Sequence, residues 1–261
     1  TGSAGTTVNS GTGSITIGGA GGALNLGAGT FTSTATGTAI DITNATTVAF
    51  ANLTAGPGTI SVTGTGGITV GGTLTSSNTT GTAIVLRAGD GTAAGTASGG
   101  DIDISTGTIS LTSGGGAVLY TGNLSSPGVV AAAGGSGSGR FRYNSNPTTQ
   151  NFTLALNPAA VSAVFRETAT LTVTANNASK SYGTNDPAQS YQSVTGYING
   201  DSGGLTGSYG RAGGESVGTK SITQGTVASN VGYSISFAGG QNFTITQAAL
   251  QVIARKGYHQ A

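Results

Sequence analysis

The residues of this sequence that could carry out chemistry are few, and they gather most densely in SKSYGTNDPA, Ser179–Ala188. Lys180, Tyr182 and Asp186 bring an amine, a phenol and a carboxylate together in a chain of which only 7% is charged. A lysine with Glu215 beside it could form an isopeptide bond to an asparagine side chain. A Tyr-Gly pair followed by Asp-Pro is equally typical of a turn. We interpret the stretch as the start of a structural repeat.

Asp101 and Asp103 are the one candidate for an acid pair, because they alternate with isoleucines and so face the same side of a strand. Paired carboxylates can cleave polysaccharides or bind Ca²⁺. No Arg, Lys or His lies nearby in the sequence to complete a lyase-type site, so we expect a solvated strand face. His259 is the single histidine, and cysteine is absent. We therefore predict no catalytic residue, no cofactor and no metal site, and a protein that is not an enzyme.

Threonines two residues apart form the candidate binding surface. Thr30 and Thr32 lie in TFTS, and Thr73 and Thr75 lie in TLTS. Residues i and i+2 of a strand share a face, so stacked strands would carry these hydroxyls as a flat ladder. Such a face could bind a glycan or ice. Threonine is also a common outward-facing strand residue with no ligand at all.

The elements that must position these residues are very short strands. Two apolar residues separated by one polar residue, then a glycine break, predict a half-buried strand. The pattern recurs at Ile15/Ile17, Leu24/Leu26, Ile40/Ile42, Val48/Phe50, Ile60/Val62, Ile68/Val70, Ile84/Leu86, Ile102/Ile104, Ile109/Leu111 and Val118/Tyr120. Strands this short cannot bury an apolar face alone, so neighbouring units must stack.

Two architectures satisfy that requirement, an antiparallel sandwich or barrel and a right-handed parallel β-helix. TFTSTATGTAIDI and TLTSSNTTGTAIVL repeat with Gly37 and Gly81 in equivalent places, a period of about 44 residues. That period divides into two coils of about 20 residues, a size typical of solenoids. The breaks also lack the Asn-Gly and Asp-Gly pairs that mark hairpins. We favour the β-helix.

Composition limits the partners. Glycine contributes 49 of 261 residues, but only 5 prolines and no Gly-X-Y period are present, which excludes collagen. A formal net charge of +1 gives no electrostatic attraction to nucleic acid. The sequence holds no apolar run of about 18 residues, so we expect no membrane insertion. Methionine is absent, which indicates a processed chain or a fragment.

The repeats resemble the β-helix of filamentous-haemagglutinin-like exoproteins, the secreted partners of two-partner secretion systems. GGDIDISTGTISLTSGGG (Gly99–Gly116) and GSITIGG (Gly13–Gly19) carry the resemblance. It implies β-helix repeats over residues 1–165, of which about 137–165 form a C-terminal cap. Arg140, Arg142 and Tyr143 bring charge and aromatic rings to that cap after a long stretch poor in both.

Residues 166–248 have a different sequence pattern, in which longer alternating strands such as Thr170–Ala175 are separated by residues typical of turns. The segment is similar to the MBG domains, bacterial Ig-like repeats found in tandem on large secreted adhesins. The resemblance implies a β-sandwich spacer or adhesive module. The matching residues are Lys180, Tyr182, Gly183, Asp186, Pro187, Gly196, Gly200, Asp201, Arg211, Gly214, Glu215, Val217, Gly218, Tyr233 and Phe243–Thr246.

Residues 249–261 begin like the first strand of a further repeat but then depart from it. They are a tail, or a strand that pairs across chains through Leu250, Val252 and Ile253. We accordingly expect a secreted structural adhesin or matrix fibre protein on the outer surface of a Gram-negative bacterium. Its expected partners are other copies of itself or a host or matrix polysaccharide, with a glycan- or ice-binding module as the alternative function.

Overall fold

The computed structural model describes residues 5–252 of the chain, and those residues are all-β apart from one short helix, α1 (Val129–Ala132). Contacts between residues group the chain into two compact units. Unit 1 comprises residues 1–171, 196–205 and 228–235, and unit 2 comprises residues 172–195, 206–227 and 236–261. The domain boundaries expected from the sequence remain a prediction, because the two units do not follow a single cut in the chain.

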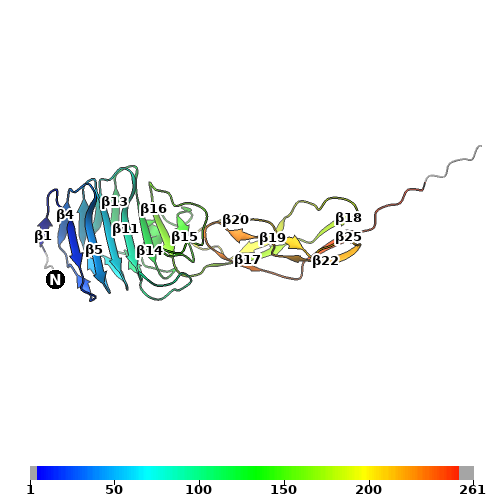
Figure 1. Cartoon of the computed structure of the whole chain (residues 1–261), viewed down its shortest axis with the longest axis horizontal. Coiled ribbons are helices and arrows are strands. Elements are labelled where there is room, and N and C mark those ends of the chain that lie inside the picture. Colours follow the sequence, from blue (N-terminus) through cyan, green and yellow to red (C-terminus); the bar gives the residue numbers. More distant parts are fainter. Residues whose placement is uncertain (1–4, 253–261) are drawn as a thin grey trace, which may run out of the picture. The chain divides into compact units, whose positions relative to one another are not determined.

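Three parallel sheets built from successive coils make up most of unit 1 (Figure 1). One has five strands, in the order β1 (Thr7–Asn9), β4 (Thr30–Ser33), β7 (Asn52–Ala55), β10 (Thr73–Ser76) and β13 (Thr108–Leu111). A second has seven, in the order β15 (Phe141–Arg142), β16 (Val161–Phe165), β14 (Gly115–Thr121), β11 (Gly81–Ala88), β8 (Thr59–Gly64), β5 (Thr38–Ala45) and β2 (Ile15–Gly18). The third has four, in the order β12 (Ile102–Asp103), β9 (Ile68–Val70), β6 (Val48–Phe50) and β3 (Leu24–Asn25).

The order of the strands confirms the predicted parallel β-helix. Each coil gives one strand to each sheet before the chain moves to the next coil, so strands three apart in sequence order pair in parallel. A parallel pairing between adjacent coils leaves no place for the hairpins of a sandwich or barrel. The alternative architecture is therefore excluded for this part of the chain.

The core is a narrow column in which like residues stack in register. Leu53 pairs with Leu74, and Ile60 pairs with both Ile40 and Ile84. All five side chains are 0% exposed. Alternate residues of the same strands point outward, which is why their burial pattern alternates along β7, β8 and β10. Because each coil contacts only its neighbours, stability is distributed along the stack.

Glycine is abundant because the corners of adjacent coils almost touch. A Cβ at Gly58 would lie 2.4 Å from the carbonyl oxygens of Ala35 and Gly37. At Gly100, whose φ is +130°, a Cβ would lie 2.3 Å from the backbone of Gly66. Both positions exclude any other residue, the second by its backbone conformation as well.

Two buried arginines satisfy carbonyl groups where the regular coils end. Arg142 is 3% exposed and donates from Nε to Leu154 O at 2.8 Å and from Nη2 to Ala155 O at 2.8 Å. Arg166 is 1% exposed and donates to the carbonyl oxygens of Ala88 and Gly100. Burial lowers the pKa of both guanidinium groups from their ordinary value. A guanidinium has five donors, so each arginine satisfies several carbonyl groups at once.

The remaining strands form three small sheets. The first has the order β19 (Tyr191–Thr195), β17 (Thr170–Ala175) and β24 (Ser234–Phe237). The second has the order β18 (Ala178–Ser181), β25 (Asn242–Thr246), β22 (Gly218–Thr223) and β21 (Gly210–Arg211). The third pairs β20 (Leu205–Thr206) with β23 (Ala228–Ser229). β17 pairs with β19, and β22 with β25, in antiparallel fashion, whereas β18 and β25 are parallel. Val173, Ile222, Phe243 and Ile245 form the buried interior of unit 2.

No helix in the described part of the chain is long and apolar enough to cross a membrane.

The stacked column predicts different costs for inward and outward residues of one strand. We expect Leu53→Ala to lower the free energy of unfolding by about 2–5 kcal/mol, because it opens a cavity between two coils. Thr54→Ala, which removes the adjacent outward side chain, should change it by no more than about 0.5 kcal/mol. Urea unfolding followed by circular dichroism measures both. Equal losses would contradict the inward stacking of Leu53.

Candidate functional site

The predicted threonines lie on one flat, outward face of the five-stranded sheet. Two polar rows cross its strands, and every strand contributes one residue to each row. The first row holds Thr7, Thr30, Asn52, Thr73 and Thr108; the second holds Asn9, Thr32, Thr54, Thr75 and Ser110. The structure thus gathers Thr30, Thr32, Thr73 and Thr75 on one surface, with β7 between the two pairs.

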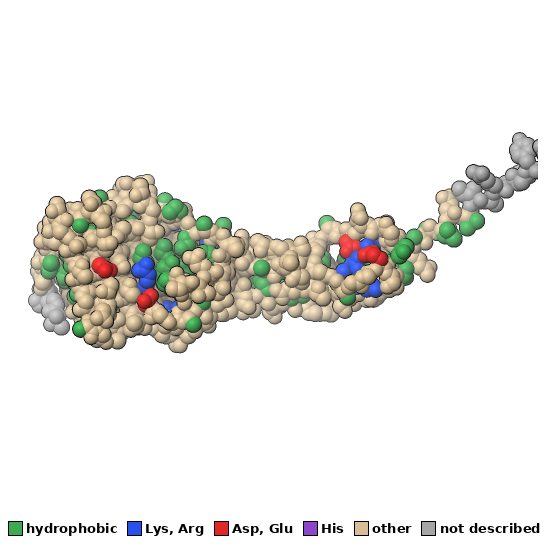
Figure 2. Space-filling view, in the orientation of Figure 1, with side chains coloured by type: hydrophobic (Ala, Val, Ile, Leu, Met, Phe, Trp, Pro, Cys, Tyr) green, Lys and Arg blue, Asp and Glu red, His purple; other side chains and the backbone are tan. Residues whose placement is uncertain are grey.

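Hydrogen bonds along the first row fix some of these groups. Thr73 and Thr108 place their Oγ1 atoms 3.1 Å apart, and Asn52 Oδ1 accepts from the Thr73 backbone N–H at 2.9 Å. Sequence reasoning missed Thr54, because NLTA (52–55) begins with Asn52 and so lacks the Thr-x-Thr pattern of TFTS and TLTS. The face carries hydroxyl and amide groups without charge, and on the side drawn in Figure 2 charged side chains are sparse over the coils. Such a surface can exchange hydrogen bonds with a neutral, hydroxyl-rich ligand.

Asp101 and Asp103 do not form an acid pair. Asp103 accepts from the backbone N–H of Ser105 at 3.0 Å and from its hydroxyl at 2.6 Å, and these bonds lower the pKa of the carboxyl. Asp101 accepts from the backbone N–H of Asn123 at 2.6 Å. Both carboxylates are half-buried and engaged in turns, rather than standing in solvent as the sequence suggested. Over residues 5–252 no group of three or more His, Asp or Glu could hold a metal ion. His259 lies outside the described residues.

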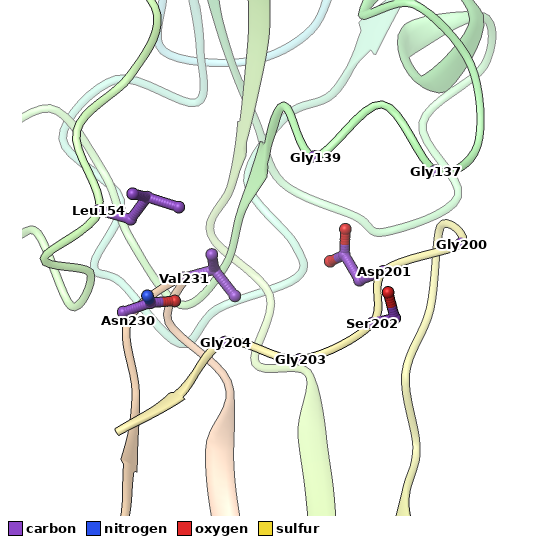
Figure 3. Close-up of a pocket in the computed structure, with 10 residues that line it drawn as sticks. All are labelled: Gly137, Gly139, Leu154, Gly200, Asp201, Ser202, Gly203, Gly204, Asn230 and Val231. Atoms are coloured by element: carbon purple, nitrogen blue, oxygen red, sulfur yellow. The ribbon is translucent and has the colours of Figure 1, made fainter. Parts of the chain in front are cut away.

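A hollow of about 250 Å³ within unit 1 has the carboxylate residue Asp201 in its wall (Figure 3). Its wall is largely glycine backbone, and Figure 3 shows Asp201 and Ser202 on the same loop with Asn230 across the hollow. The residues lining it are Gly137, Gly139, Leu154, Gly200, Asp201, Ser202, Gly203, Gly204, Asn230 and Val231. The sequence placed Gly200 and Asp201 only among the residues that match the MBG pattern, because a glycine-rich stretch around one acid carries little information about a cavity.

The carboxylate of this hollow is fixed by two tyrosines. Asp201 Oδ2 accepts from the hydroxyl of Tyr143 at 2.7 Å and from that of Tyr233 at 2.9 Å. The two rings lie with their centroids 4.5 Å apart. Burial is the main cause that raises the pKa of both phenols, that of Tyr233 to about 12. The tyrosines therefore remain neutral donors, and their role is to hold the loop rather than to transfer protons.

Four charged residues in and around Ser179–Ala188 form a closed ring in unit 2, where Figure 2 shows blue and red side chains together. They are Lys180, Asp186, Arg211 and Glu215. Lys180 Nζ lies 2.7 Å from Asp186 Oδ1 and 2.5 Å from Glu215 Oε2. Arg211 Nε lies 2.8 Å from Asp186 Oδ2, and its other arm pairs with Glu215. Arg211 and Glu215, four residues apart in the sequence, thus form an ion pair. Arg211 also lies over the Phe243 ring, 4.8 Å from its centroid.

The ring stabilises the ionised forms of its members. Hydrogen bonds from Arg211, then Lys180, lower the pKa of Asp186 to about 2, and bonds from Lys180 and Arg211 lower that of Glu215. The bond to Asp186 is the largest cause that raises the pKa of Lys180. Of the described side chains, Asp186 and Glu215 are the ones paired with Lys180, and neither is the asparagine that the isopeptide hypothesis needed. Condensation requires a neutral amine, which this site disfavours.

The predicted assembly strand is exposed where the structure describes it. Leu250 and Val252 are 87% and 80% exposed, and neither lies in a strand. Ile253 lies outside the described residues. Two large apolar side chains of alternating position are therefore open to solvent after the last strand, β25.

Comparison with known families matches residues 171–244 to the MBG domain (YGX type). This match confirms the predicted domain type, and it fits a bacterial Ig-like, adhesin-type protein with an extracellular or surface role. Neither the search of curated proteins nor the search of solved structures gave a match. The resemblance of the coils to filamentous-haemagglutinin-like exoproteins stays a prediction.

The ring of four charges predicts a pH-dependent contribution to stability. Carboxyls with depressed folded pKa values stabilise above their unfolded pKa, and this contribution is lost as pH falls through the folded pKa. The double variant Asp186→Asn/Glu215→Gln should therefore be less stable than the parent chain above about pH 5, and the difference should vanish towards pH 2.

Urea unfolding of both chains at pH 6, 4 and 2.5 measures this difference. Because the four groups are near the surface, 1 M salt should shrink it at pH 6. A difference that stays constant from pH 6 to pH 2.5 would show that the substitutions act through packing instead.

Proposed function

We propose that this chain is a non-enzymatic structural adhesin of the cell exterior, in which a β-helical shaft carries an Ig-like module. The observation that carries the proposal is the stack of parallel coils in unit 1, combined with the MBG match over residues 171–244. A stack of this kind is stiff because every coil is hydrogen bonded to the next along its whole length. Such a structure suits a spacer that holds a binding or joining surface away from a cell.

The surface chemistry supports a structural role over a catalytic one. Asp101 and Asp103 are separately engaged in turns, and the tyrosines beside Asp201 are held neutral. The ring around Lys180 is ionised and closed on itself. These groups are engaged in holding a loop or a strand.

We further propose secretion to the outer surface of a Gram-negative bacterium through two-partner secretion, and partners that are either other copies of this chain or a polysaccharide. The near-zero net charge favours neutral partners over nucleic acid. The exposed Leu250 and Val252 favour self-assembly, since apolar residues at a free chain segment gain most by burial against another surface.

The self-assembly part of the proposal predicts fibres. Negative-stain electron microscopy of the purified chain, concentrated to the micromolar range or above, should show end-to-end polymers. A chain ending at Ala248 should remain as single particles, because it lacks the exposed apolar segment. Polymers of equal length from both chains would show that residues 249–261 are not needed for assembly.

A second candidate function, glycan or ice binding, is favoured by the two in-register polar rows of the five-stranded sheet. Rows of hydroxyls on a flat sheet present a regular lattice of donors and acceptors about 4.8 Å apart between strands. A polymer with a repeating hydroxyl pattern could make the same contact at each coil.

This second function predicts that Thr32→Lys/Thr75→Lys weakens glycan binding at least about tenfold, since long side chains would cover the row. Thr69→Lys is the matched control, because Thr69 faces solvent from β9 on a different sheet. A glycan array followed by titration of the best ligand measures binding, and an ice-recrystallisation assay on the same variants tests ice. Equal loss in the control, or no ligand in either assay, would eliminate the threonine face as a binding site.

A further inference from the structure

The five-stranded sheet ends two strands earlier than the seven-stranded sheet. β13 is the last strand on its side, whereas the seven-stranded sheet continues past β14 through β16 and β15. Over residues 5–252 no strand pairs with the outer edge of β13.

The open edge has both unpaired backbone groups and underpacked side chains. The N–H groups of Thr108 and Thr112 donate back to Gly72 O and Ser76 O of the preceding coil. In a parallel strand, the backbone groups of successive residues face opposite neighbours. The N–H and C=O groups of Ile109 and Leu111 therefore face away from β10, toward the open edge. Their side chains are half-buried, although Leu74, which pairs with Ile109, is 0% exposed.

A hollow of about 350 Å³ lies at the start of this edge. It is lined by Ile104, Ser105, Gly107, Thr108, Ile109, Gly128, Ala131 and Ala132. Its walls combine apolar side chains with two hydroxyl groups and two glycines, and Thr108 and Ile109 of β13 form part of them. An extended peptide with alternating apolar residues fits such a site.

We propose that residues Ala249–Val252 of a second copy of this chain add to β13 as a parallel strand. The proposal rests on the self-assembly part of the proposed function and names its acceptor. Ala-Leu-Gln-Val has the same alternation as Thr-Ile-Ser-Leu of β13 (108–111). Leu250 and Val252 would cover Ile109 and Leu111, while Gln251 would stand beside Ser110 and extend the second polar row.

Donor and acceptor are different surfaces, so the contact is head-to-tail. A head-to-tail contact that does not close into a ring produces an open filament. Each contact would bury Leu250 and Val252, which are 87% and 80% exposed in the single chain, and would pair the outward backbone groups of β13. This interaction is strand addition to a sheet edge, for which main-chain bonds give affinity and alternate side chains give specificity.

The absence of cysteine makes disulfide trapping the direct test. A Ser110→Cys chain is mixed with a Gln251→Cys chain under mild oxidation, because these residues face each other in the proposed register at a distance that a disulfide spans. We expect a disulfide-linked dimer containing one chain of each kind. Asn9→Cys mixed with Gln251→Cys is the matched control, since Asn9 holds the same row on β1 at the opposite edge of the sheet.

A dimer with the Asn9→Cys chain and none with the Ser110→Cys chain would transfer the acceptor to β1 and overturn the proposal. So would a chain carrying both Ser110→Cys and Gln251→Cys that closes mainly on itself as a monomer at every concentration tested.

Charge at the edge gives an independent test. Ile109→Lys should raise the concentration needed for polymers about tenfold or more, because a lysine on an edge strand opposes strand addition. Val8→Lys makes the same kind of change on β1, where Val8 is 38% exposed, and should leave assembly unchanged. Circular dichroism checks that both variants remain folded.

The outcomes separate this proposal from the proposed function. Polymers that require residues 249–261 but are insensitive to Ile109→Lys and form no Ser110–Gln251 disulfide would overturn β13 as acceptor and leave the structural role standing. Single particles from the parent chain at all concentrations would instead overturn self-assembly itself.

Discussion

The hydrogen-bond ladder between parallel coils is the constraint on which the rest of this structure depends. Every coil must place its backbone groups opposite those of the next coil, so the cross-section must stay constant along the stack. Inward positions then accept residues of similar size in register, as Ile40, Ile60 and Ile84 do, and corners accept only glycine where backbones meet. Low charge follows as well, since like charges stacked on neighbouring strands would repel.

Much of the fold could be predicted because this constraint produces patterns that are visible within a few neighbouring residues of the sequence. The alternation of Ile68 and Val70 or of Ile84 and Leu86 identified strands, and their matching phrases indicated stacked coils. β13 shows the limit, because its phrase TISL resembles the strands before it, yet its outer edge is unpaired. Whether a neighbour is present depends on the path of the chain beyond the strand, which local pattern does not contain.

The candidate sites were predictable to the extent that they follow the same periodicity. Thr32 and Thr75 share a row because both occupy the outward phase of their strands, and a period of two residues is enough to infer it. Asp201 could not be found in this way. Its position depends on Tyr143 and Tyr233, which are distant in sequence and meet it only after folding. The ring around Lys180 was partly visible, since Arg211 and Glu215 are near in sequence, whereas the approach of Asp186 is tertiary.

Two buried charged residues, Arg142 and Arg166, lie beside carbonyl groups outside the strands, and this placement follows from the cost of unpaired backbone. Between adjacent coils the backbone ladder satisfies the carbonyl groups. Arg142 supplies donors to Leu154 O and Ala155 O, and Arg166 to Gly100 O, despite the cost of desolvation. Among the described residues, no arginine donates to the open edge of β13, and the hollow at its start is lined by Ile104, Ser105, Gly107, Thr108, Ile109, Gly128, Ala131 and Ala132. The outward backbone groups of β13 are thus left without a buried donor or acceptor, as expected if a strand, rather than solvent, is to occupy the edge.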